Sequence, residues 1–104
     1  VVHIYDELII GSGSVFSWNV SILDGDGHSL YYDNKSNTPK GIYIEKNVWV
    51  GNGVTILKGV TIGEGSVIAA GSVVTHPIPA RSLAAGIPAR VIKSDIAWRY
   101  DYTY

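Results

Sequence analysis

The chain has 104 residues, so it is at most one small domain, and its 8 basic and 9 acidic residues give a net charge of -1. This balance excludes the strong basic patch expected of a protein that binds nucleic acid or an anionic membrane surface. Zero cysteines exclude disulfides, thiolate metal sites and a cysteine nucleophile, and agree with a cytoplasmic location. No apolar run reaches the length of about 18 residues needed for a membrane span. With 12 Val, 13 Ile and 12 Gly against 5 Leu, the composition predicts short strands and tight turns.

In chain order, the first predicted elements are short strands that recur every six residues. The inward positions begin at Ile4, Ile10, Phe16 and Ile22, and resume at Ile44, Val50, Ile56, Ile62, Ile68 and Val74. Three residues after most of them stands a turn former: Gly13, Asn19, Gly25, Asn47, Gly53, Gly59, Gly65 or Gly71. A six-residue period fits neither an α-helix nor a long strand. It fits a short strand followed by a sharp corner, where Gly or Asn supplies a positive φ.

Three such units make a triangular coil of about 18 residues, so like residues stack on like. We therefore expect an all-β protein, a parallel β-helix of about four coils over residues 1–79, with Ile4 stacked on Ile22 and Ile44 on Ile62. Small or aliphatic residues four positions after the anchors form a second inward set, including Val48, Val54, Val60, Ser66 and Ser72. An ordinary sandwich or barrel is the alternative, but irregular strands would not hold one phase over so many steps.

The repeat is interrupted between Ile22 and Ile44, which are 22 residues apart, four more than one coil. The excess falls in residues 25–41, whose polar and turn-rich second half predicts an extruded loop, a common carrier of function. Residues 80–104 form a proline-punctuated closing segment. The tail alternates aromatic and polar residues (Trp98, Tyr100, Tyr102, Tyr104), which favours either a cap on the last coil or a contact with another subunit.

Several segments resemble the hexapeptide-repeat acyltransferases, and most closely the sugar and capsular-polysaccharide O-acetyltransferases related to the galactoside and maltose acetyltransferases. They are Asn47–Asn52 (NVWVGN), Val54–Gly63 (VTILKGVTIG), Val67–Thr75 (VIAAGSVVT), Ala85–Ile92 (AGIPARVI), and Asp26-Gly-His28 before a polar loop. The resemblance implies a left-handed β-helix, against the usual right-handed crossover preference. It also implies transfer of an acetyl group from acetyl-CoA to a hydroxyl of a sugar or polysaccharide.

His28 is the candidate general base, since imidazole can remove the hydroxyl proton and return one to the departing thiolate near neutral pH. Gly25 and Gly27 allow the sharp turn that would expose its ring, and either Asp26 or Asp24 could fix the tautomer. A solvated loop histidine and a plain turn acid are the structural alternatives.

The resemblance also implies positions for the acyl donor. It places Trp49 in the donor channel or the acceptor wall, and backbone N–H groups near Gly51 and Asn52 at the oxyanion. The pantetheine arm would lie along Ala70, Gly71 and Thr75, and the coenzyme phosphates would meet Arg90 and Lys93. His76, next to Thr75, is a further candidate for a phosphate contact. Corner packing for Trp49 and solvated surface positions for the charged residues are the alternatives.

The family's sites lie between subunits of a trimer, so His28 of one chain would face Trp49 or Ala70 of its neighbour. A charged content of only 16% agrees with a partly covered surface. No metal is expected, because His3, His28 and His76 are far apart in the sequence and Asp24–His28 only partly follows a calcium loop. A non-catalytic β-helix scaffold and an N-acyltransferase acting on an amino sugar remain the alternative functions.

Overall fold

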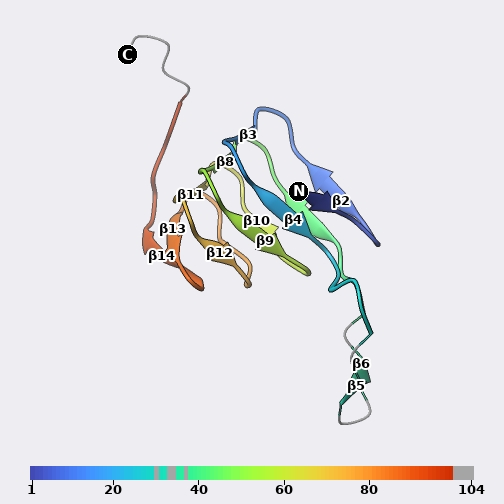
Figure 1. Cartoon of the computed structure of the whole chain (residues 1–104). Helices are drawn as coiled ribbons and strands as arrows, with labels where there is room; N and C mark the ends of the chain where they lie inside the picture. Colours follow the sequence, from blue (N-terminus) through green and yellow to red (C-terminus); the bar gives the residue numbers. More distant parts are fainter. Residues whose placement is uncertain (30, 33–34, 37, 100–104) are drawn as a thin grey trace.

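The computed structural model describes residues 1–29, 31–32, 35–36 and 38–99, and this part of the chain contains strands but no helix. The strands stack in three faces (Figure 1). The first face contains β1 (Val2–His3), β4 (Ser21–Leu23), β9 (Thr55–Leu57) and β12 (Val73–Val74). The second contains β2 (Leu8–Ile10), β7 (Ile42–Ile44) and β10 (Thr61–Ile62), extended by a parallel bridge from Ile62 to Ile78. The third contains β3 (Val15–Phe16), β8 (Trp49–Val50), β11 (Val67–Ile68) and β13 (Leu83–Gly86).

The chain visits the three faces in turn, and all pairs between these strands are parallel, which makes a β-helix of four coils. The first corner, between the first and second faces, comprises residues 4–7, 24–41, 58–60 and 75–77. The second corner comprises residues 11–14, 45–48, 63–66 and 79–82, and the third corner residues 17–20, 51–54 and 69–72. The predicted all-β coil architecture is therefore confirmed.

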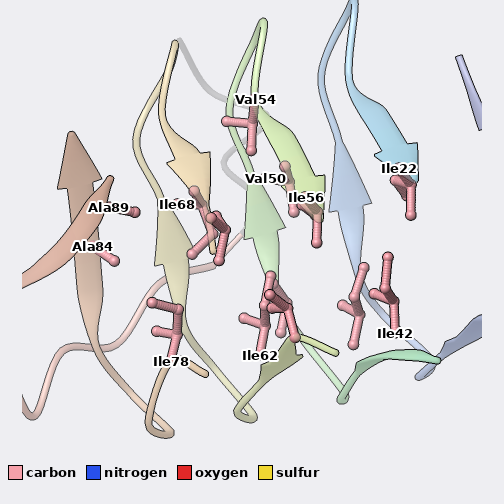
Figure 2. Close-up of a cluster of buried hydrophobic side chains, with 14 residues drawn as sticks. Ile22, Ile42, Val50, Val54, Ile56, Ile62, Ile68, Ile78, Ala84 and Ala89 are labelled. Atoms are coloured by element: carbon pink, nitrogen blue, oxygen red, sulfur yellow. The ribbon is translucent and has the colours of Figure 1, made fainter. Parts of the chain in front are cut away.

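The core follows the six-residue period. Ile44, Val50, Ile56, Ile62, Ile68 and Val74 are 0–1% exposed. Figure 2 shows the side chains of Val50, Ile56, Ile62 and Ile68 pointing into the coil. Burying one such side chain stabilises the fold by about 1.5–3 kcal/mol. The second inward set is buried from the second coil onward, at Val48, Val54, Val60, Ser66 and Ser72, whereas Leu8, Ser14 and Val20 of the first coil are only partly buried. The buried Ser66 is satisfied, because its hydroxyl donates to the Pro79 carbonyl at 2.7 Å and accepts the Ser82 N–H at 3.1 Å.

Most predicted corner residues have the expected left-handed backbone, with φ between 55° and 76° at Gly13, Asn19, Asn47, Gly53, Gly59, Gly65 and Gly71. Gly25 is the exception: its φ is not positive, and the residue is buried. A Cβ there would lie 2.9 Å from Cδ2 of Tyr5 and 3.3 Å from Cγ of Pro39. Gly25 is therefore required for close packing at the base of the loop, not for a left-handed turn.

The predicted stacking of Ile4 on Ile22 is wrong, since the partner of Ile22 is Val2. The first corner has four residues in the first coil, at positions 4–7, but three in the third and fourth coils, at 58–60 and 75–77, because the backbone at residues 5–7 wraps around the carboxylate of Asp24. The side chain of Ile4 is left 36% exposed. Ile44 does stack on Ile62, as expected.

The predicted excess of four residues between Ile22 and Ile44 is also wrong. Ile22 and Ile44 lie in one coil, on neighbouring faces, because they stack on Ile56 and Ile62 of the next coil. Their separation of 22 residues must therefore be compared with one six-residue step, not with a whole coil. The inserted segment holds the antiparallel pair β5 (Tyr31–Tyr32) and β6 (Lys35–Ser36), which projects from the coils in Figure 1.

The closing segment begins with a hairpin in which β14 (Ala89–Lys93) pairs antiparallel with β13. Ala84 and Ala89 of this hairpin are buried against the last coil, so the hairpin caps the core (Figure 2). Trp98 does not pack in this cap but lies at the second corner, where its indole N–H donates to the Asn47 carbonyl at 2.7 Å. Tyr100, Tyr102 and Tyr104 lie outside the described residues. Across the described part, no helix is long and apolar enough to cross a membrane.

Candidate active site

The insertion extends from the first corner, and its two ends are joined by a backbone hydrogen bond. The Lys40 N–H donates to the Asp24 carbonyl at 2.9 Å, which joins the two ends of the insertion. The Gly59 N–H then donates to the Lys40 carbonyl at 3.1 Å, which fixes the insertion to the next coil. The segment that carries His28 therefore starts from a position set by the rigid coil.

Asp24 is committed to the neighbouring turn. Its buried carboxylate accepts the backbone N–H groups of Tyr5, Asp6 and Glu7 at 2.6, 2.7 and 2.9 Å. Burial acts to raise the pKa of Asp24, but these hydrogen bonds outweigh it and hold the pKa below its ordinary value of 3.8. Of the two acids considered for orienting His28, Asp24 thus has a structural role of its own.

His28 and Asp26 line the same pocket, which has a volume of about 260 Å³ at the base of the insertion. Both side chains are exposed, and the wall also includes Tyr5, Tyr31 and Thr38. Aromatic faces beside a carboxylate and an imidazole make a pocket that can hold a polar ring and exchange a proton with it.

Lys58 belongs to this site, although the sequence analysis gave it no role. Its ammonium lies 2.8 Å from Oδ2 of Asp26, with 29% of the Lys58 side chain and 49% of the Asp26 side chain exposed. An ion pair at this exposure contributes about 0–1 kcal/mol to stability, so its main effect is to hold the Asp26 segment against the coil. The register of β4 with β9 could have indicated it, because Leu23 pairs with Leu57 directly before the two segments.

The predicted donor positions at the third corner are tightly stacked. The Gly51 N–H donates to the Ile68 carbonyl and the Gly71 N–H donates to the Asn52 carbonyl, both at 2.8 Å. A Cβ on Gly51 would lie 2.7 Å from the backbone nitrogen of Ala70. The N–H of Gly51 is thus engaged between coils and is not available to an oxyanion.

The remaining predicted residues are spread over the first corner, the third face and β14. The Thr75 hydroxyl is 2.8 Å from Nδ1 of His76, at the first corner. Trp49 is 42% exposed on the third face, where its ring centroid lies 5.9 Å from that of Trp98. Arg90 and Lys93 are exposed on β14.

The structure therefore brings together His28 and Asp26, and separately Gly51, Asn52, Ala70 and Gly71. The first group is at the first corner and the second at the third corner, with the width of the first face between them. Trp49, on the third face, is likewise away from the first corner. One chain thus supplies the two halves of the predicted site on separate edges of the coil. Within the described residues, no group of three His, Cys, Asp or Glu side chains is placed to hold a metal ion.

Comparisons with known proteins agree with this architecture. Residues 41–76 match the family described as bacterial transferase hexapeptide (six repeats). A Klebsiella pneumoniae protein described as an uncharacterized 24.8 kDa protein in the cps region is 50% identical over 97 residues. That alignment covers 92% of this chain and 44% of the relative.

Two of the solved structures that share the fold are acetyltransferases with more than 30% identity. The polysialic acid O-acetyltransferase OatWY is 31% identical, with a TM-score of 0.85, and is matched over 92% of this chain and 48% of its own. Galactoside acetyltransferase in complex with coenzyme A is 35% identical, with a TM-score of 0.72, over 89% and 53% of the respective chains. The chain thus spans about half the length of these relatives.

The handedness expected from the resemblance follows from these matches: the four coils form the left-handed parallel β-helix of these acetyltransferases. Residues 41–76 thus match the hexapeptide-repeat transferase model, and the stacked coils share the left-handed β-helix fold of these acetyltransferases.

Proposed function

We propose that this protein is an acetyl-CoA-dependent O-acetyltransferase that acts on a hydroxyl of a sugar or polysaccharide, with His28 as general base. The observation that carries the proposal is the exposed His28 in a pocket of about 260 Å³, on a segment anchored to the rigid coil. The similarity to a polysialic acid O-acetyltransferase, to galactoside acetyltransferase bound to coenzyme A and to a protein of a cps region supports the substrate class.

In this proposal His28 takes the proton of the acceptor hydroxyl while the oxygen attacks the thioester carbonyl. The carbon–sulfur bond then breaks, and His28 returns the proton to the departing thiolate, so that charge and protons balance. A positioned base of this kind contributes about 10²–10⁴-fold to the rate. Asp26, two residues before His28, is the acid proposed to orient the imidazole, while Lys58 fixes the position of its carboxylate at 2.8 Å.

The acceptor is proposed to bind in the same pocket. Tyr5 and Tyr31 offer aromatic faces, and Asp26 and Thr38 offer polar groups. Sugar rings combine an apolar face with a rim of hydroxyls, which is the pattern that such a lining matches.

The donor is proposed to bind across a subunit boundary in a homotrimer. His28 and the third corner lie on separate edges of one chain, so a neighbouring chain is needed to bring them together. Trp49, Asn52, Ala70, Gly71 and Thr75 would then line the acetyl-CoA arm, and Arg90 and Lys93 would meet its phosphates. Gly51 contributes by letting the coils approach closely. Use of acetyl-CoA also favours a cytoplasmic location.

The test is acetyl transfer from acetyl-CoA to a panel of acceptors: neutral and acidic oligosaccharides, amino sugars and buffer alone, with coenzyme A release and acetylated product both measured. The proposal predicts ester formation on a saccharide hydroxyl at a rate well above thioester hydrolysis. Amide formation on amino sugars alone would overturn the O-acetyl assignment. Absence of any transfer, together with no thermal stabilisation by coenzyme A, would favour the non-catalytic scaffold.

A further inference from the structure

A second hollow lies away from the His28 pocket, between the C-terminal segment and the second corner. Its volume is about 510 Å³, and its polar lining comprises Asn47, Arg81, Trp98 and Arg99. The segment is tied down at two points. The Ile96 N–H donates to the Arg81 carbonyl at 3.1 Å, and the Trp98 indole N–H donates to the Asn47 carbonyl at 2.7 Å. The hollow is therefore formed by residues distant in sequence that are fixed to the coil.

Arg81 occupies a backbone position that disfavours it. Its φ is +51°, and the equivalent corner positions of the other three coils are Gly13, Asn47 and Gly65, which tolerate this conformation better. A residue kept in a sparsely populated conformation indicates that its side chain is needed there. Here that residue is an arginine that lines the hollow.

The hollow is positively charged. Arg81 and Arg99 both line it, and none of the residues in its wall is acidic. Within the part of the chain that the structure describes, the one ion pair is that of Lys58 with Asp26 at the first corner. Two guanidiniums on one hollow provide the forked donors that carboxylate and phosphate oxygens match.

Trp98 adds an aromatic wall held in a fixed orientation. Its indole N–H is used by the Asn47 carbonyl, and its ring leans on Trp49 with an interplanar angle of 47°. A ring fixed in this way loses little conformational entropy when a ligand packs on it. A flat or ring-shaped ligand that also carries an oxyanion fits this combination of groups.

We propose that this hollow binds the carboxylate-bearing unit of an acidic saccharide, with Arg81 and Arg99 on its oxyanion and Trp98 along its ring. The inference rests on the proposed function, because it names the acceptor as an acidic glycan held at a second point outside the His28 pocket. Coenzyme A phosphates share the oxyanion chemistry, but the proposed donor positions at Asn52, Ala70 and Gly71 lie on the third corner, not the second.

The test measures binding by calorimetry, without acetyl-CoA, for three probes: an oligosaccharide of α-linked sialic acid, a neutral oligosaccharide of equal length, and coenzyme A. The variants are R81N and R99Q. Asn is chosen at position 81 because Asn47 holds the same corner conformation in another coil, so the fold is retained. K46Q is the matched control, since Lys46 is an exposed cation at the same corner but is not in the wall of the hollow.

We expect R81N and R99Q each to weaken binding of the acidic probe by about tenfold or more, K46Q by less than about twofold, and coenzyme A binding to stay unchanged. Equal weakening by K46Q would show general charge attraction and overturn the proposal. Loss of coenzyme A binding instead, or unchanged binding of the acidic probe, would also overturn it. Because no transfer is measured, an inactive protein that still binds the acidic probe through Arg81 would refute the proposed function and leave this inference standing.

Discussion

Replacing Asp24 by Asn tests whether its carboxylate holds the turn beside the His28 pocket. Oδ1 accepts the Tyr5 N–H, and Oδ2 accepts the N–H groups of Asp6 and Glu7. An amide has one acceptor oxygen, so at best it keeps the Asp6 and Glu7 bonds and turns its NH2 group toward the Tyr5 N–H. Losing one charge-assisted bond of about 1.5–3 kcal/mol and weakening the other two predicts that D24N is less stable by about 2–3 kcal/mol.

The assay is urea unfolding followed by circular dichroism, in which that loss would shift the midpoint by about 1–2 M. The pH dependence gives an independent check. Because the folded pKa of Asp24 lies below 3.8, its contribution to stability is complete above the unfolded pKa and is lost as the pH falls through the folded pKa. D24N should lack this part of the acid dependence. A variant as stable as the native chain, with the same acid profile, would refute the assigned role of Asp24.

Three further predictions concern the coil. G51A should be strongly destabilised, because its Cβ would lie 2.7–3.0 Å from backbone atoms of the next coil. G71A has open space around the added Cβ and only a strained φ of +74°, so its free energy of unfolding should fall by about 1–2 kcal/mol. Comparable losses in thermal unfolding would contradict this difference. I56A should cost about 2–5 kcal/mol in urea unfolding, and I10A less, because Ile56 is fully buried and Ile10 is 45% exposed; a larger loss for I10A would be inconsistent with the burial described. K58A should change stability by about 1 kcal/mol or less, since the ion pair is exposed; a much larger loss in thermal unfolding would show that Lys58 has a structural role beyond it.

The coil could be predicted from the sequence because the six-residue pattern that specifies it is visible within short segments of the chain. Inward residues such as Ile62 and Ile68 recur every six residues, and each is followed three residues later by a corner residue. The positions that face the core can therefore be identified without knowing the rest of the fold. The register across the insertion is not local in this sense. Ile22 pairs with Ile56, 34 residues away, and only the stacking of coils shows that Ile44 belongs to the same coil as Ile22.

The site was less accessible to sequence reasoning for the same reason. Asp24 and Asp26 are equivalent in the sequence, and their different roles depend on a turn at residues 5–7 and on Lys58, both distant in the chain. Likewise, no sequence pattern joins Trp98 to Asn47, 51 residues earlier, although this contact forms the second hollow. What the sequence did indicate was the place of His28, at the one interruption of a regular repeat.

The central claim, that His28 is the general base of an acetyl transfer, is tested most directly by the turnover of H28A with acetyl-CoA and the best saccharide acceptor of the panel. H3A is the control, since His3 is an exposed histidine on β1. The account predicts that H28A loses at least about 10²-fold in kcat while its circular dichroism and coenzyme A binding stay unchanged, and that H3A keeps its activity. Near-normal turnover by a folded H28A would contradict it.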